Sequence, residues 1–266
     1  MPEKKGYALI TGGTSGIGYE LAKLFAKDGY NLVIVARDEQ GLQTTANELQ
    51  REYGIGVETI SKDLFKRESA FELYNEISQK GITIDVLVNN AGQGQYGEFI
   101  DTDINREIDI IQLNIISLVA LTKQFLKDMV SRGSGKILNV ASIAGKIPGP
   151  LQSVYHGTKA FVHSFTEAIR EEVKDSGVTI TSLLPGATQT DFFAKADMLE
   201  AKNVKDKKLD DPADVARDGY EALMSGTDKV ISGIKNKMQV AMSNVIPDSM
   251  VAANVHQQQS PAEADK

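Results

Sequence analysis

Short apolar runs alternate with longer segments of helical periodicity along most of this chain, and this alternation restricts its fold more than any other feature. The runs are rich in β-branched residues, and several are apolar throughout, as strands are when helices cover both faces of their sheet. Seven runs are predicted as strands: residues 7–10, 31–36, 56–61, 86–88, 136–140, 179–184 and 229–231. The pattern predicts an α/β fold with a doubly wound, mainly parallel seven-stranded sheet and helices on both faces.

Helices are predicted between these strands at residues 18–28, 39–53, 66–80, 104–132, 153–176 and 212–225. Glycines follow several of them, and glycine most easily adopts the positive φ at which helices end. The segment 104–132 contains the most apolar stretch of the chain, but charged and amide side chains interrupt it. We therefore expect a buried helix there rather than a membrane span.

The 266 residues are expected to form one main domain, because α/β units of this length commonly remain undivided. We assign residues 1–232 to this domain. Within it, residues 191–211 are rich in Lys, Asp and Ala without a deep apolar stripe, which is typical of a mobile lid. Residues 233–256 form a C-terminal extension of unassigned role, and the polar residues 257–266 are expected to be a disordered tail.

Charge and cysteine content argue against several kinds of partner and site. With 29 Lys and Arg against 36 Asp and Glu, the net charge is −7, which disfavours nucleic acid or an anionic membrane as a partner. The chain has no cysteine, and its three histidines join no cluster with metal-ligand spacing, so no metal site is expected. No secretory signal precedes the first apolar segment, and we expect a soluble, cytoplasmic protein.

A glycine-rich segment, TGGTSGIG, directly follows the first predicted strand and opens the first predicted helix. At such a junction, backbone N–H groups and the positive end of the helix converge, and missing side chains let a pyrophosphate approach. The spacing is neither G-x-G-x-x-G nor a Walker loop, because no Lys follows the last glycine. The alternative is a tight strand-to-helix connection. We favour a dinucleotide site, and its candidate residues are Gly12, Thr14, Ser15, Gly16, Ile17 and Gly18.

The second predicted strand ends at Ala36, and Arg37 follows it. In a dinucleotide site the strand tip lies beside the adenosine ribose, where an acidic residue favours NAD and an arginine can pair with the 2′-phosphate of NADP. Arg37 therefore favours NADP(H) over NAD(H). The alternative is that Arg37 is a solvated loop residue paired with Asp38.

Tyr155 and Lys159 are four residues apart at the start of a predicted helix, so their side chains share one face. A phenol has an unperturbed pKa of about 10 and is a poor base at neutral pH, but a nearby ammonium lowers that pKa. Ser142 follows the fifth predicted strand and can donate a hydrogen bond to a substrate oxygen. The three residues together suit proton transfer at a carbonyl group. Tyr-x-x-x-Lys alone more often indicates only a lysine stem resting on a ring.

Asparagine side chains occur at two further places in the sequence that can contribute to the site. The segment Asn89-Asn90-Ala91-Gly92 follows the fourth predicted strand, at the sheet edge where parallel sheets hold their ligands. Asn114 interrupts an otherwise apolar helical stretch. It is either a core residue whose amide is hydrogen-bonded within the protein or a residue of the site.

With these residues assembled, the chain resembles the classical short-chain dehydrogenase/reductase family over about residues 6–232. The resemblance implies a Rossmann fold. The VAR ending of the second strand and the segment ISGIKNKM further resemble the DltE-like bacterial oxidoreductase subgroup. The family motifs occur in order as TGGTSGIG, Asp63-Leu64 after the third strand, NNAG at 89–92, Asn114, Ser142, YHGTK at 155–159, and Pro185-Gly186 followed by Thr190.

The resemblance implies a role for each matching residue. Tyr155 would be the general acid or base, Ser142 would orient the substrate, and Asn114 would hold a water in a proton relay. Lys159 would tune Tyr155 and bind the nicotinamide ribose, and Asp63 and Leu64 would flank the adenine. The remaining cofactor contacts would come from Asn90, Ala91, Gly92, Pro185, Gly186, Thr188 and Thr190.

The sequence therefore predicts an NADP-dependent oxidoreductase that interconverts an alcohol and a carbonyl on a small, partly apolar molecule. The alternatives are a non-catalytic dinucleotide-binding regulatory protein and an epimerase or dehydratase with bound nicotinamide. The substrate pocket is expected after Ser142, at residues 93–96 and under the lid, whereas His156 is expected to be structural or solvent-exposed. The resemblance also implies a homodimer or homotetramer, formed through the helices at 104–132 and 153–176.

Overall fold

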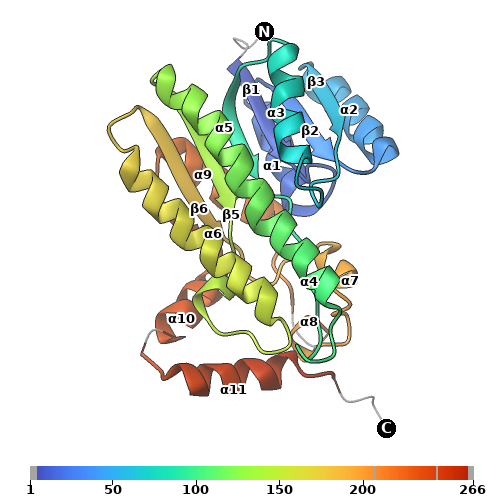
Figure 1. The fold of residues 1–266 in the computed structure, drawn as a ribbon, viewed down its shortest axis with the longest axis vertical. Helices are drawn as coiled ribbons and strands as arrows, with labels where there is room; N and C mark the ends of the chain where they lie inside the picture. The colour runs from blue at the N-terminus through green and yellow to red at the C-terminus, as the bar shows by residue number, and fades with distance from the viewer. Residues whose placement is uncertain (1–4, 206–207, 244, 263–266) are drawn as a thin grey trace.

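The computed structural model describes residues 5–205, 208–243 and 245–262. Its strands form one sheet in the order β3-β2-β1-β4-β5-β6-β7, and every neighbouring pair is parallel (Figure 1). Their bounds are β1 (Lys5–Thr11), β2 (Tyr30–Ala36), β3 (Val57–Ser61), β4 (Ile84–Asn89), β5 (Gly135–Val140), β6 (Val178–Leu184) and β7 (Lys229–Ile231). Each predicted strand is confirmed, with ends that shift by at most two residues.

Helices follow the strands in alternation, as the sequence predicts. They are α1 (Gly16–Lys27), α2 (Glu39–Tyr53), α3 (Ser69–Gln79), α4 (Ile104–Ile111), α5 (Leu118–Ser131), α6 (Ser153–Glu172), α7 (Phe192–Lys195), α8 (Lys202–Lys205), α9 (Pro212–Ser225), α10 (Ile234–Ser243) and α11 (Asp248–Gln259). A π-helical turn, η1 (Gln112–Ser117), joins α4 to α5, and a 3₁₀ turn, η2 (Ile143–Lys146), follows β5.

Local sequence explains where several of these helices begin and end. The carboxylate of Asp211 accepts a hydrogen bond from the Ala213 N–H and caps α9, whose first residue is Pro212. Proline suits this position because the first N–H of a helix has no intrahelical partner. Gly226 then ends α9 in the left-handed conformation at φ 73°. The residues that flank 212–225, Asp211 and Gly226, therefore specify where this helix begins and ends.

Two apolar layers hold the helices against the sheet. On one face, Leu21 and Phe25 of α1, Leu42 of α2 and Leu223 of α9 are buried in one cluster with the strands. On the other face, a second cluster joins the strands to α3, α5 and α6. Figure 1 shows α3, α5 and α6 side by side in front of the sheet. The doubly wound fold is thus confirmed.

The order of the strands reverses at β1, which lies between β2 and β4. In open parallel sheets, ligands bind in the crevice beyond the carboxyl ends of the strands at such a reversal. The glycine-rich turn follows β1 and the NNAG segment follows β4, so the fold brings these two motifs together at that point.

The continuous helical stretch Ile104–Ser131 is long and apolar enough to cross a membrane by length and composition, and it alone passes that test in the described part of the chain. However, 56% of its most apolar window is buried inside the protein. Core helices of soluble proteins pass the same test, and this packing agrees with the buried helix that the sequence predicts.

The predicted lid contains the two short helices α7 and α8 and has a small apolar cluster of its own, formed around Phe193, Ala196, Met198 and Ala201. Residues 206–207 of the lid lie outside the described residues. The C-terminal extension forms α10 and α11, which lie across the end of the molecule near the lid (Figure 1).

The boundary of the polar tail differs from the one the sequence predicts. Helix α11 continues to Gln259, and the Ala262 N–H donates to the Glu200 carbonyl of the lid at 2.7 Å. Ser260 likewise accepts a hydrogen bond from the Lys202 N–H. These tertiary contacts order residues 257–262, although their composition alone does not predict it. Residues 263–266 lie outside the described residues.

Candidate active site

A cavity of about 1250 Å³ opens at the carboxyl ends of the strands. This volume exceeds the 300–1,000 Å³ that is usual for a single small ligand, so it can hold a dinucleotide and a substrate together. All of the site residues proposed from the sequence line it except Gly18, Asp63 and Asn114. Those that do are Gly12, Thr14, Ser15, Gly16, Ile17, Arg37, Leu64, Asn90, Ala91, Gly92, Ser142, Tyr155, Lys159, Pro185, Gly186, Thr188 and Thr190.

The glycine-rich turn is held in shape by Asn90. The Asn90 side-chain amide donates to the carbonyl oxygens of Thr11 and Gly12, each at 3.0 Å. Gly12 and Gly16 have φ values of 66° and 54°, a region that side chains disfavour. Ser15 precedes α1 without making a capping hydrogen bond, so its hydroxyl leaves the first N–H groups of the helix open to a ligand. The turn therefore has the space and the open N–H groups that a phosphate group would need.

Gly18 has a packing role rather than a place on the cavity wall. A Cβ atom at Gly18 would lie 2.2 Å from the Gly12 carbonyl oxygen and 2.4 Å from the Asn90 amide nitrogen. Both distances are far below van der Waals contact. Only glycine lets α1 approach the turn this closely.

We expect Gly18→Ala to lower the free energy of unfolding by about 1–3 kcal/mol, because the added methyl group must displace backbone atoms. Urea unfolding followed by circular dichroism measures the change. Gly157→Ala is the matched control, since Gly157 lies in α6 with open space around it and alanine favours a helix. The control variant should be as stable as the parent protein or slightly more stable, and equal stability of Gly18→Ala and the parent would contradict the expectation.

The end of the cavity where the sequence predicts the adenosine is built around Arg37 and Phe65. The Arg37 guanidinium carbon lies 5.0 Å from the centre of the Phe65 ring, and that of Arg106 lies 5.3 Å from it. Asp38 does not pair with Arg37 in the described structure, because its carboxylate caps α2 by accepting from the Gln40 N–H at 3.1 Å. Arg37 thus lines the cavity without a carboxylate partner, so the pairing with Asp38 considered from the sequence is absent here, although Arg37 is solvent-exposed as that alternative expected.

The turn after β3 supplies the rest of this end. Leu64 and Lys62 line the cavity, and Lys62 also forms an ion pair with Glu72 at 3.2 Å. Asp63 lies off the cavity wall, and its carboxylate accepts a hydrogen bond from the Phe65 N–H at 3.3 Å. Asp63 therefore shapes the turn that presents Leu64 and Phe65. Lys62 and Phe65 carry no motif of their own, so sequence reasoning missed them.

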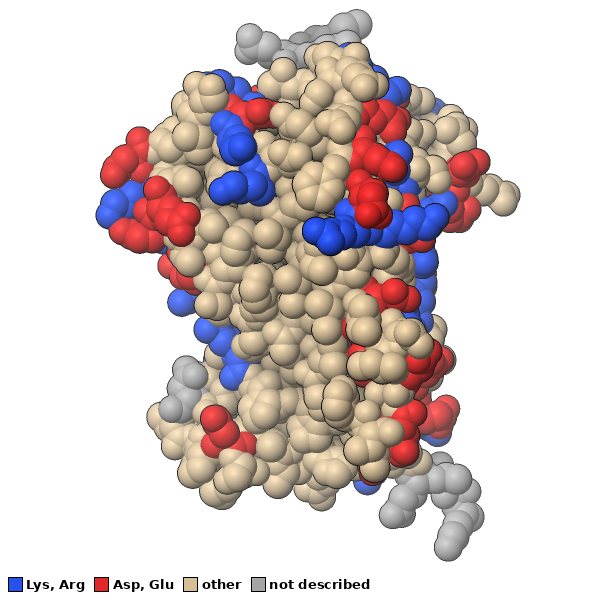
Figure 2. Space-filling view, viewed as in Figure 1, with Lys and Arg blue, Asp and Glu red and all other residues tan. Residues whose placement is uncertain are grey.

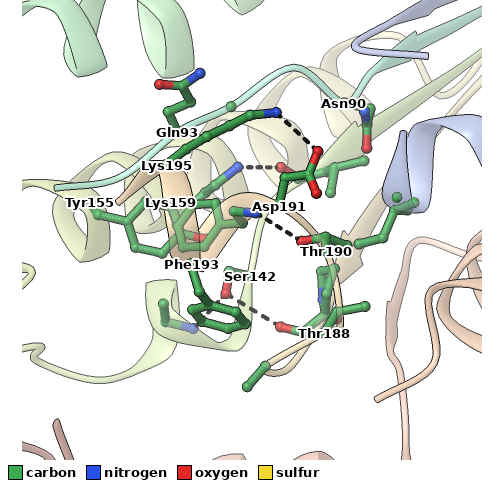
Figure 3. A pocket seen from close by; sticks show the side chains of 18 of the residues that line it. Asn90, Gln93, Ser142, Tyr155, Lys159, Thr188, Thr190, Asp191, Phe193 and Lys195 are labelled. Atoms are coloured by element: carbon green, nitrogen blue, oxygen red, sulfur yellow. Dashed lines mark hydrogen bonds and ion pairs between the residues drawn. The ribbon is translucent and has the colours of Figure 1, made fainter. Parts of the chain in front are cut away.

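Tyr155, Lys159 and Ser142 project into the same space (Figure 3). The Lys159 ammonium donates to the Val140 carbonyl at 2.8 Å and lies 5.8 Å from the centre of the Tyr155 ring. The Ser142 hydroxyl accepts a hydrogen bond from the Ala144 N–H at 3.1 Å, which fixes the side chain at the start of η2. The proximity that the sequence predicts for these three residues is confirmed.

Burial controls the protonation of this group. It raises the pKa of Tyr155 to about 12, and a hydrogen bond with the Ser142 hydroxyl opposes the rise. Burial lowers the pKa of Lys159 to about 8. The sequence suggested that the Lys159 ammonium would lower the pKa of the phenol. In the structure, desolvation outweighs any such effect, and Tyr155 is held in its protonated form.

Asn114 sits in the π-helical turn η1 and is almost fully buried. Its amide nitrogen donates to the Gln93 carbonyl at 2.9 Å and to the Thr158 hydroxyl at 3.0 Å, and its oxygen accepts from the Gln93 N–H at 3.0 Å. Asn114 thus ties the loop after β4 to α6 at Thr158, which is three residues after Tyr155 and directly before Lys159. The relay water proposed from the resemblance stays a prediction.

The segment after β6 forms the wall next to the lid. Thr190 accepts a hydrogen bond from the Phe192 N–H at 3.3 Å, and Lys195 pairs with Asp191 at 3.5 Å (Figure 3). The aromatic ring of Phe192 lies with its centre 5.0 Å from that of Tyr155. The first residues of the predicted lid therefore pack against Tyr155.

The C-terminal extension contributes to the cavity in a way that the sequence did not show. A Cβ atom at Gly186 would lie 2.4 Å from the amide nitrogen of Asn236 in α10. The same nitrogen donates to the Asp210 carboxylate at 2.8 Å. Gln258 and Gln259 of α11 also line the cavity. No local pattern marks these residues, because tertiary contacts alone bring the extension to the site.

His156 is buried, in agreement with the structural alternative, but it also lines the cavity. Its Nδ1 atom is 2.9 Å from the Ile147 carbonyl oxygen. Gln152, one turn earlier, lines the cavity as well. Among the described residues, no group of three His, Asp or Glu side chains could hold a metal ion.

Comparison with solved structures agrees with this architecture. A short-chain dehydrogenase from Sphingobium yanoikuyae in complex with NADPH has a TM-score of 0.81 and 28% sequence identity, covering 91% of this chain and 97% of that one. A bulky-bulky ketone specific alcohol dehydrogenase from Comamonas testosteroni has a TM-score of 0.77 and 26% identity, covering 92% and 96%.

Comparison of sequences gives more identical relatives. The very-long-chain 3-oxoacyl-CoA reductase of Laccaria bicolor is 38% identical over 185 residues, which are 68% of this chain and 54% of that protein. This chain thus matches about half the length of that relative. An uncharacterized oxidoreductase of Staphylococcus aureus is 31% identical over 209 residues, covering 79% of this chain and 87% of that protein.

A family model described as short chain dehydrogenase matches residues 6–200, which include the glycine-rich turn, Ser142, Tyr155 and Lys159. The match covers most of the chain and every motif that builds the cavity. This chain therefore belongs to the short-chain dehydrogenase family.

Proposed function

We propose that this protein is an NADP(H)-dependent oxidoreductase that reduces a carbonyl group on a small, partly apolar molecule, with Tyr155 as the proton donor. The observation that carries the proposal is the placement of Tyr155, Ser142 and Lys159 in one cavity with a glycine-rich phosphate cradle. Each part alone has a structural explanation, but their combination fits hydride transfer coupled to proton transfer.

The residues present fit a dinucleotide that carries a 2′-phosphate. Gly12 and Gly16 leave room for a pyrophosphate beside the open start of α1, and Arg37 offers an unpaired guanidinium at the ribose end. When bound, NADPH supplies a hydride to the substrate carbon. The structural neighbour in complex with NADPH and an archaeal alcohol dehydrogenase complexed with 5-hydroxy-NADP, at 26% identity, support the same cofactor here.

The protein itself supplies orientation and the proton. The Ser142 hydroxyl and the Tyr155 hydroxyl can both donate to one carbonyl oxygen, which stabilises the negative charge that develops there. Tyr155 then gives its proton to that oxygen. Because burial keeps the phenol protonated, the site as it stands is ready for the reductive direction. Lys159, anchored on the Val140 carbonyl, places a positive charge beside the phenolate that remains.

The walls around this group suit an apolar substrate. Phe192 and Phe193 of α7 and Met198 of the lid line the cavity together with Ile143 and Val255. Relatives named 3-oxoacyl-CoA reductase and a neighbour named ketone-specific alcohol dehydrogenase support a ketone as the reacting group.

The proposal is tested by following the absorbance of NADPH with a panel of aldehydes, aliphatic ketones, quinones and 3-oxoacyl thioesters. We expect consumption of NADPH with at least one class of ketone. If the protein binds NADPH but no carbonyl compound accelerates its oxidation, the proposed function is wrong.

Arg37 should determine the preference between the two nicotinamide cofactors. Loss of a charge-assisted contact with the 2′-phosphate should raise the KM for NADPH by about 10- to 100-fold in Arg37→Ala, and the KM for NADH should change little. Steady-state kinetics with both cofactors measures the difference. Arg67→Ala, which removes an exposed arginine away from the cavity, should leave both values unchanged. A lower KM for NADH than for NADPH in the parent enzyme would contradict this role.

We also propose that the protein forms a homo-oligomer through α4, η1 and α6. Large apolar side chains are exposed on these elements: Ile104, Ile108, Ile111, Ile116 and Phe161. Figure 2 shows a broad area without charged side chains over the helices on this side of the molecule. We expect light scattering to give a mass of at least two chains, and Ile108→Glu to lower that mass because it puts a charge into the interface.

A further inference from the structure

Three buried amide atoms on the cavity wall have no hydrogen-bond partner within the described structure: Nε2 of Gln152, Oδ1 of Asn203 and Oε1 of Gln259. Of these residues, Gln152 and Gln259 are the most buried, each being only 5% exposed. A buried polar atom without a partner costs about 1–3 kcal/mol, so native proteins leave few of them unexplained. Unpartnered atoms on two nearly fully buried residues of one cavity wall, Gln152 and Gln259, indicate a place where a ligand completes the hydrogen bonds.

The orientation of the Gln259 amide follows from its neighbours. The Nδ1–H of His156 donates to the Ile147 carbonyl at 2.9 Å, and burial lowers the pKa of His156, which leaves its Nε2 as an acceptor. The Gln259 amide nitrogen lies 3.4 Å from that Nε2 atom and donates to it. The Tyr96 hydroxyl donates to the Gln259 main-chain carbonyl at 2.6 Å. These contacts hold Gln259 in place and leave its Oε1 atom free to accept.

Gln152 supplies the complementary donor close to the reacting group. A Cβ atom built at Gly94 would lie 3.3 Å from the Gln152 amide nitrogen and also 3.3 Å from the Cδ2 atom of Tyr155. The free donor and the phenol ring therefore border the same small space. Gln152 also begins the turn of helix that leads to His156, whose N–H donates to the Gln152 carbonyl.

We propose that Gln152 and Gln259 form a polar subsite beside Tyr155, which binds a second polar group of the substrate. Because one atom donates and the other accepts, the group that fits must do both, as a hydroxyl or an amide does. The nearby wall from Phe192, Phe193 and Met198 is apolar, so this subsite sets the position of that group along the substrate. This inference rests on the proposed function.

The test compares octan-2-one with hydroxylated octan-2-ones that carry the hydroxyl at each carbon from C4 to C8, and with 7-oxooctanamide. We expect the parent enzyme to favour at least one polar ketone by about 10-fold in kcat/KM, mainly through KM. Gln259→Met keeps the side-chain volume and removes the amide, and it should abolish this preference while octan-2-one is still reduced. Gln257→Met, an exposed position on the same helix, should retain it.

Binding of the same ketones to the NADPH complex of Tyr155→Phe, measured by calorimetry, separates the two proposals. If the polar ketone binds more tightly and Gln259→Met removes the difference, but the parent enzyme reduces no ketone, the subsite stands and the proposed function fails. If ketones are reduced without any preference, or Gln259→Met leaves the preference intact, the polar subsite is overturned. Equal thermal unfolding midpoints of Gln259→Met and Gln257→Met exclude misfolding as the cause.

Discussion

Tyr155→Phe should reduce kcat/KM for carbonyl reduction by about 10²- to 10⁴-fold, the contribution typical of a positioned general acid. The change removes only the hydroxyl. The ring contact with Phe192, at 5.0 Å between ring centres, and the packing against Lys159 remain available to phenylalanine. We therefore expect the KM for NADPH and the thermal unfolding midpoint to stay close to the parent values. Stopped-flow measurement of a single turnover locates the loss in the chemical step.

Tyr74→Phe is the matched control for this loss. Tyr74 bonds to Asp128 through its hydroxyl and lies outside the cavity. Removal of that hydroxyl should leave turnover unchanged. Equal turnover by Tyr155→Phe and the parent enzyme would show that another group provides the proton.

The fold could be predicted largely from the sequence because its strands are buried on both faces and separated by helices. Continuous apolar runs such as β2 and β6 leave few other structures open to the chain. The prediction was less complete within the long helix at 104–132, where periodicity gives no sign of the π-helical turn. Within that turn, Asn114 makes tertiary hydrogen bonds with Gln93 and Thr158, which local periodicity does not reveal.

The site was predicted where its residues occur in short motifs at the ends of strands. The glycine-rich turn, Ser142 and Tyr155 could be placed because the fold fixes where each strand ends. Gln259 could not be placed, since it lies 103 positions after His156 in the sequence and reaches it through a helix that the sequence left unassigned. Composition likewise predicted a disordered tail there, because it gives no information about contacts with the lid.

Charge states could not be predicted from the sequence either, because desolvation depends on how deeply the fold buries a group. Spacing alone suggested that Lys159 would act on Tyr155 as an ordinary ammonium. The structure leaves only 6% of Lys159 exposed, with the Val140 carbonyl as its recorded hydrogen-bond partner. Its pKa falls from 10.5 to about 8, so the folded protein holds this charge at a cost to stability.

Lys159→Met should abolish reduction and remove the contribution of Lys159 to the pH dependence of stability. Between pH 8 and 10.5 the unfolded chain keeps a proton on Lys159 that the folded protein has lost, so this contribution to the stability of the parent rises with pH across the window. The full rise corresponds to about 3 kcal/mol. Methionine cannot be charged, so the variant should lack the rise. Its stability relative to the parent should therefore be highest below pH 8 and fall by about that amount towards pH 10.5.

Urea unfolding at intervals from pH 7 to pH 10.5 measures this difference, and Lys174→Met provides its control. The Lys174 side chain is 58% exposed, so its removal should leave the pH dependence of the parent protein in place. Loss of the Val140 hydrogen bond lowers the stability of Lys159→Met by a similar amount at every pH, and it does not alter the slope. Parallel curves for Lys159→Met and the parent would show that the folded protein does not depress the pKa of Lys159. If Lys159→Met and Lys174→Met both changed the slope of stability against pH in the same way, that slope would belong to another titrating group.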